Sequence, residues 1–157
     1  LLEYRYIYSR EFFKRREFMI YNIFYDSNKE IKWSTTGAVN DAIIAAQSSI
    51  GLSHVALDIE NHPDQNYYVN SDATALVEKS VFNFTFSTLT PALDDVINVT
   101  GLPVGTEIFK DGESMGTMTD TTLTLTTQEP GSYTILFKKQ YYKKHSGTTI
   151  SVKRYGE

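Results

Sequence analysis

The chain has 157 residues with 15 basic and 19 acidic side chains, a formal net charge of −4 at pH 7 and no cysteine. The absence of cysteine excludes disulfides and thiolate metal sites within this sequence. The length allows one domain or two small ones. No stretch approaches the roughly 20 apolar residues that a membrane-spanning helix needs, so we expect no membrane insertion.

Residues 1–18 mix aromatic and basic side chains but have neither the apolar core nor the small-residue cleavage site of a signal peptide. Met19 then begins a segment with strand character. We interpret residues 1–18 as a leader outside the native protein, with Met19 as the true start. The alternative is that they form a short helix or basic arm that belongs to it.

Residues 19–80 predict a small α+β module, a sheet with one helix. Alternation of apolar and polar side chains indicates strands at residues 20–25, 30–34, 54–59, 67–69 and 75–79. A helix is expected over residues 37–50, capped by Thr35 or Thr36 and ended by Gly51. Its apolar residues recur at spacings of three and four, which predicts one buried face. They are Val39, Ile43, Ala46 and Ile50.

Residues 81–157 predict an all-β module. The segment 81–87 places Phe82, Phe84 and Phe86 on one face of a strand. Further strands are expected at residues 96–100, 106–110, 122–126, 132–138 and 148–153, and Asp111-Gly112 is a tight-turn dipeptide. Several short strands separated by glycine and proline turns indicate a sandwich. The boundary between the modules is expected near residue 80, with little linker.

Both modules resemble parts of known proteins. The order LPVGTEIFKDGESMGT, then a polar strand, then PGSYTILFKKQYY resembles Ig-like β-domains of the PEGA type and C-terminal Ig-like modules of bacteriophage structural proteins. This resemblance covers about residues 82–152. The segment NYYVNSDATALVEKSVFNF resembles the N-terminal modules of phage tail and accessory virion proteins. The resemblances imply an Ig-like sandwich after the α+β module, and they bring no catalytic residues with them.

Adjacent tyrosines and lysines are the candidate partner-contact residues. They are Tyr67, Tyr68, Tyr141, Tyr142, Lys143 and Lys144. If each tyrosine pair lies in a strand, one ring points inward and the other outward. The outward rings are then available to a neighbouring protein or, beside the lysines, for stacking on a sugar or nucleobase. The alternative is that one tyrosine of each pair is core and the other covers a loop.

Charge is distributed unevenly along the chain. Residues 19–137 hold four basic against 15 acidic side chains, whereas residues 138–157 hold six basic against one acidic. An acidic body with a basic C-terminal strip favours head-to-tail docking or an acidic partner surface. Alternatively, the lysines protect edge strands from pairing. The acidic remainder of the surface disfavours nucleic-acid binding.

No motif in the sequence indicates catalysis or a cofactor. Four acidic side chains are of the kind that binds hard cations such as calcium: Asp58, Glu60, Asp64 and Asp72. They lack the spacing of a calcium-binding loop, so we predict an acidic strand edge rather than a metal site. We therefore expect a non-enzymatic structural or assembly protein of a phage virion, assembled in the host cytoplasm. Its partners would be other virion proteins, further copies of itself or a cell-surface glycan. The alternative is a bacterial surface module of the PEGA or carbohydrate-binding kind.

Overall fold

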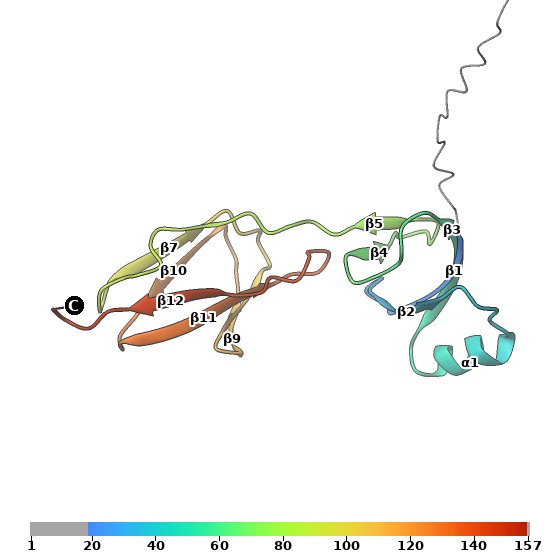
Figure 1. The fold of residues 1–157 in the computed structure, drawn as a ribbon, viewed down its shortest axis with the longest axis horizontal. Coiled ribbons are helices and arrows are strands. Elements are labelled where there is room, and N and C mark those ends of the chain that lie inside the picture. Colours follow the sequence, from blue (N-terminus) through green and yellow to red (C-terminus); the bar gives the residue numbers. More distant parts are fainter. Residues whose placement is uncertain (1–18, 157) are drawn as a thin grey trace, which may run out of the picture.

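A computed structural model describes residues 19–156, and this part of the chain holds twelve strands and one helix. The strands form antiparallel sheets in two groups at opposite ends of an elongated molecule (Figure 1). The N-terminal module contains β1 (Met19–Tyr25), β2 (Ile31–Thr35), α1 (Asp41–Ser49), β3 (Ser53–Ile59), β4 (Tyr67–Val69) and β5 (Leu76–Glu78). The C-terminal module contains β6 (Thr85–Phe86), β7 (Val96–Thr100), β8 (Glu107–Lys110), β9 (Glu113–Thr117), β10 (Thr122–Thr126), β11 (Gly131–Lys138) and β12 (Thr148–Val152).

The N-terminal module is a three-stranded sheet, β2-β1-β3, covered on one face by the β4–β5 hairpin. Alternation along β1 turns Ile23 and Tyr25 toward this hairpin, where they are buried with Leu57 and Val69. On the other face Phe24 is fully buried, and the ring of Trp33 stacks on it with centroids 4.1 Å apart. The strands predicted here are present, and the sheet buries residues on both faces.

The helix differs from its prediction. It runs over Asp41–Ser49, with the Asn40 side chain as its N-cap, and none of its residues is buried. Ile43 is 37% exposed and Ile50, just beyond the helix, is 70% exposed, so the predicted buried face is wrong. The physical reason is that this short helix packs mainly against β3, while its contact with β2 is a polar one, in which the Trp33 indole N–H donates to the Gln47 side-chain oxygen at 3.0 Å. The neighbouring Thr35 belongs to β2, where its hydroxyl accepts from the Gly37 N–H instead of capping the helix.

The C-terminal module consists of two antiparallel sheets around one core. The sheet β10-β7-β6 faces the sheet β12-β11-β8-β9. The side chains that fill the space between them include Ile97, Val99, Ile135, Phe137 and Ile150, all at most 2% exposed. The predicted β-rich class is therefore confirmed. Strand β9, whose residues are all exposed, was not among the predicted strands.

The strand predicted over residues 81–87 is shorter in the structure, where β6 spans only Thr85–Phe86. Thr85 pairs with Thr100, which is the last residue of β7, and the backbone turns immediately after that strand, at Gly101. Gly101 has a φ of +88°, and a Cβ there would lie 2.7 Å from the Asn83 carbonyl oxygen. Residues 81–84 therefore have no partner strand among the described strands. Phe82 and Phe84 still pack against the core, as the alternation predicts.

Two smaller features follow from local sequence. Asp111 and Gly112 have φ values of +50° and +85°, which is the tight hairpin geometry expected of this dipeptide, and they join β8 to β9. Within residues 19–156 no helix is long and apolar enough to cross a membrane.

Candidate functional site

The predicted contact residues gather where the two modules meet. The chain passes from β5 through Lys79 and Ser80 into the C-terminal module, and the loop after β11 returns to the same place. The Ser80 N–H donates to the Tyr141 carbonyl oxygen at 2.9 Å, and the Lys143 N–H donates to the Ser80 carbonyl oxygen at 2.7 Å. Two backbone hydrogen bonds therefore attach this loop, residues 139–144, to the connection. We call residues 139–144 the junction loop.

Three side-chain contacts join the junction loop to the N-terminal module. The rings of Tyr68 and Tyr141 stack with centroids 4.1 Å apart. The Gln140 amide nitrogen donates to the Asn28 carbonyl oxygen at 3.2 Å. The Lys143 Nζ donates to the Glu78 Oε1 at 2.6 Å, and this hydrogen bond raises the pKa of the Lys143 ammonium group. The two modules are thus held together by direct contacts.

This geometry corrects one expectation about the tyrosine pairs. Tyr141 and Tyr142 do not lie in a strand. Tyr141 lies in a turn after β11 with a φ of +66°, and Tyr142 follows it in a single bridge to Ser80. The Tyr142 ring packs on Phe82, with centroids 4.8 Å apart. In the other pair both rings, Tyr67 and Tyr68, are half-buried. The expected strand is therefore absent for Tyr141 and Tyr142. Tyr67 and Tyr68 do lie in strand β4, where the Tyr68 ring is covered by Tyr141 at the junction.

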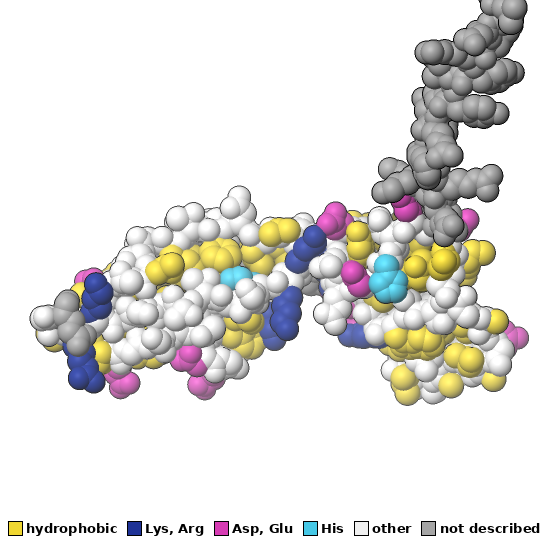
Figure 2. Space-filling view, viewed as in Figure 1, with side chains coloured by type: hydrophobic (Ala, Val, Ile, Leu, Met, Phe, Trp, Pro, Cys, Tyr) yellow, Lys and Arg dark blue, Asp and Glu magenta, His cyan; other side chains and the backbone are white. Residues whose placement is uncertain are grey.

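A cleft of about 740 Å³ opens beside the junction loop. Six lysines line it from both modules, together with two glutamates and several amide side chains. The lysines are Lys32, Lys79, Lys138, Lys139, Lys143 and Lys144. Figure 2 shows basic side chains gathered over the gap between the modules. Sequence reasoning found the four lysines of the C-terminal strip, but only the fold adds the two from the N-terminal module.

The lysines of the cleft differ in their partners. Lys79 pairs with Glu30, Lys143 with Glu78 and Lys32 with Asp26. The Lys138 ammonium lies 4.5 Å from the centre of the Phe109 ring. Lys139 and Lys144 form no ion pair with any described residue, which leaves their charges available to an anionic group. The amides of Asn28, Gln65 and Gln140 add hydrogen-bond donors and acceptors to the same cleft.

The four acids singled out in the sequence remain apart. The Asp64 carboxylate accepts from the Asn66 N–H at 2.8 Å, and the Asp72 carboxylate accepts from the Thr74 hydroxyl at 2.7 Å. Asp58 lies on β3 and Glu60 follows it. Among residues 19–156 no group of three or more acidic or histidine side chains is arranged to hold a metal ion. Asp64 and Asp72 therefore stabilise local turns.

No protein-family model, curated protein sequence or solved structure matches this chain. The residues of the junction are therefore the structural features that bear on function.

Proposed function

We propose that the protein is a non-enzymatic assembly protein of a phage virion whose junction docks on an acidic surface of a neighbouring virion protein. The observation that carries this proposal is the cleft at the junction, where Lys139 and Lys144 have no ion-pair partner among the described residues. The phage setting comes from the resemblance of both modules to virion proteins. In this proposal the two sheets of the C-terminal module form an Ig-like sandwich.

The chemistry of the cleft favours binding. Lysine ammonium groups are flexible point charges that attract an acidic surface without demanding one exact geometry. Charge of one sign in a concave site raises the rate of encounter with an oppositely charged partner. The remainder of the described protein carries a net negative charge, which favours the approach of an acidic partner at the junction rather than at the body. In this proposal the charge distribution thus orients the partner toward the junction.

The contacts at the junction let both modules act as one docking unit. The N-terminal module supplies Lys32 and Lys79, and the C-terminal module supplies the other four lysines of the cleft. Their spacing depends on the Tyr68–Tyr141 stack and on the two backbone hydrogen bonds at Ser80. In this proposal the N-terminal module faces the particle while the C-terminal module projects toward a neighbour or a cell surface.

A second candidate function is glycan binding by a bacterial surface module. The observation in its favour is that three amide side chains and Tyr142 line the same cleft as the lysines. Amides donate to and accept from sugar hydroxyls, and ammonium groups pair with acidic sugars. The two candidates differ in partner, so one experiment separates them.

The test is mass spectrometry of phage particles purified from the strain that encodes the chain. We expect the protein at a constant ratio to the major virion proteins, and we expect Lys144→Glu to reduce that ratio. Lys153→Glu is the matched control, because it reverses one charge at the far end of β12. Absence from the particles contradicts the virion role. Equal incorporation of Lys144→Glu and wild type contradicts docking through the junction.

A further inference from the structure

Within the part of the chain that the structure describes, strand β10 has one edge without a partner strand. It lies at the outside of the sheet β10-β7-β6. In an antiparallel ladder the backbone groups of successive residues point alternately to the partner and away from it. The Thr127 carbonyl oxygen accepts from the Asp94 N–H on the β7 side, whereas the Thr122 N–H donates to the Asp120 side chain instead. The backbone groups of Thr124 and Thr126 therefore face the open edge.

This edge lacks the usual protection against pairing. Natural edge strands carry charges, prolines or a covering segment. The sequence from residue 121 to 128 is TTLTLTTQ, with no charge and no proline. By contrast, the β12 edge of the other sheet is covered, because the carbonyl oxygens of Leu89 and Pro91 accept from the N–H groups of Ser151 and Lys153. Exposed threonines of high strand propensity make β10 a ready template for another strand.

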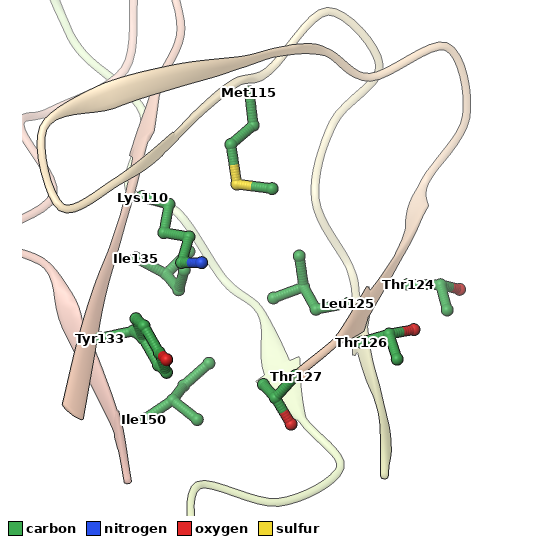
Figure 3. Close-up of a pocket in the computed structure, with 9 residues that line it drawn as sticks. All are labelled: Lys110, Met115, Thr124, Leu125, Thr126, Thr127, Tyr133, Ile135 and Ile150. Carbon is green, nitrogen blue, oxygen red and sulfur yellow. The ribbon is translucent and has the colours of Figure 1, made fainter. Parts of the chain in front are cut away.

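An apolar pocket of about 120 Å³ lies beside this edge, between the two sheets (Figure 3). Leu125 of β10, Ile135 of β11 and Ile150 of β12 form its walls, and Met115 of β9 lies across from them. A cavity of roughly 150 Å³ accepts a benzene molecule, so this pocket suits one aliphatic side chain. A strand added to β10 would turn alternate side chains toward the opposite sheet and hence toward the pocket.

Two polar groups line the same pocket. The Lys110 ammonium lies 4.4 Å from the centre of the Tyr133 ring and forms no ion pair with a described residue. The Thr127 hydroxyl is buried and has no hydrogen-bond partner among residues 19–156. A buried hydroxyl without a partner costs free energy, and an incoming backbone or carboxylate group would remove that cost. Both groups therefore favour an occupant that is polar or acidic beside its apolar side chain.

We propose that the open edge of β10 binds an extended segment of a partner protein as an added strand. One aliphatic side chain of that segment enters the pocket, and an acidic residue next to it pairs with Lys110. Main-chain hydrogen bonds to Thr124 and Thr126 give the segment its affinity, and the pocket gives specificity for its aliphatic side chain. This site is separate from the junction and does not depend on the function proposed there.

A partner segment fits the edge better than a part of this chain. The β10 strand of a second copy uses its own Leu123 and Leu125 in its own core, so it has no aliphatic side chain left for the pocket. Residues 1–18 carry five basic side chains against three acidic ones, which Lys110 would repel. A neutral or acidic segment of a partner protein with alternating apolar side chains can both fill the pocket and lie beside Lys110 without repulsion.

The test is amide hydrogen exchange of the full chain, measured by NMR with a short capped peptide. In the peptide, threonine alternates with valine around one central leucine, and a glutamate lies beside the leucine. We expect slower exchange at the amides of Thr124 and Thr126. Replacing the central leucine with alanine should weaken binding about tenfold, because the apolar burial is lost. This comparison uses the unaltered protein and does not depend on any variant folding.

Thr124→Pro tests the backbone contact directly. It removes an N–H that faces the open edge, and proline is tolerated at such positions, so we expect a folded protein that no longer binds the peptide. Thr124→Val is the matched control and should bind, because it keeps the N–H.

Three results would overturn the proposal: no change in exchange at Thr124 and Thr126, equal affinity for the leucine and alanine peptides, or slowing that grows with protein concentration in the absence of peptide. The last result would assign the edge to a second copy. None of these results bears on the function proposed for the junction, which the Lys144→Glu variant tests separately.

Discussion

The two modules bury very different amounts of apolar surface. In the C-terminal module ten buried side chains form one cluster between two sheets. In the N-terminal module the corresponding cluster has four, and Phe24 is buried separately on the opposite face of the sheet. The small module also leaves α1 without a buried residue. Since burial of apolar surface is the main favourable term in folding, we expect the stability of the N-terminal module to depend more on the junction than that of its neighbour does.

The largest expected effect comes from the core of the C-terminal module. Phe137 is fully buried, and its ring contacts those of Phe84 and His145 with centroids 5.0 Å and 5.2 Å away. We expect Phe137→Ala to lower the free energy of unfolding by about 3–5 kcal/mol, because it removes apolar contacts and leaves a cavity. Urea titrations followed by far-ultraviolet circular dichroism measure the change.

The matched variant in the N-terminal module is Ile23→Ala, which should cost about 2–5 kcal/mol. Trp33 is the single tryptophan of the chain and lies in that module, so its fluorescence reports on that module. We expect Ile23→Ala to move the fluorescence transition and Phe137→Ala to move mainly the circular dichroism transition. If both probes move together in both variants, the modules unfold as one unit and the contrast between them fails.

A smaller effect is expected at the junction. The Tyr68–Tyr141 stack should contribute about 0.5–1.5 kcal/mol beyond the area it buries. A double-mutant cycle with Tyr68→Ala and Tyr141→Ala measures this coupling. Because Tyr141 has a positive φ, Tyr141→Asn is the better single control, since asparagine tolerates that conformation and removes the ring. Additive effects of the two alanine variants would mean that the stack does not couple the modules.

The smallest effect concerns pH and the C-terminal module. Burial lowers the pKa of His145 from its ordinary value of 6.5. Its Nδ1 accepts from the Phe137 N–H at 3.2 Å, which requires the neutral ring. The unfolded chain therefore binds a proton more readily than the folded one. The contribution of His145 to stability is complete above about pH 6.5 and declines as the pH falls from there toward the lower folded pKa.

Urea midpoints at about pH 7.5 and pH 5 test this expectation. His145→Gln should make the stability less dependent on pH over that interval, since glutamine does not titrate. An equal decline in the variant and in the wild type would assign the pH dependence to other groups.

Local patterns predicted the strands well where each had a partner along its full length. Alternation located β1, β3, β7 and β12 to within two residues at each end. It failed for residues 81–84, because the strand that would pair with them, β7, ends at Thr100 and the backbone turns away at Gly101. It also failed for the buried face of α1, because helical spacing states which side chains share a face but not whether another element covers that face.

The sequence by itself determined the β-rich class, the Asp111-Gly112 turn and the basic strip that ends the chain, because these follow from neighbouring residues. The tertiary structure alone decided that Tyr141 stacks on Tyr68 and that Lys32 and Lys79 join the C-terminal lysines in one cleft. It also decided that β10 keeps an open edge beside a pocket. Such features bring together residues far apart in the chain, and their meeting depends on how whole sheets pack, which no local pattern records.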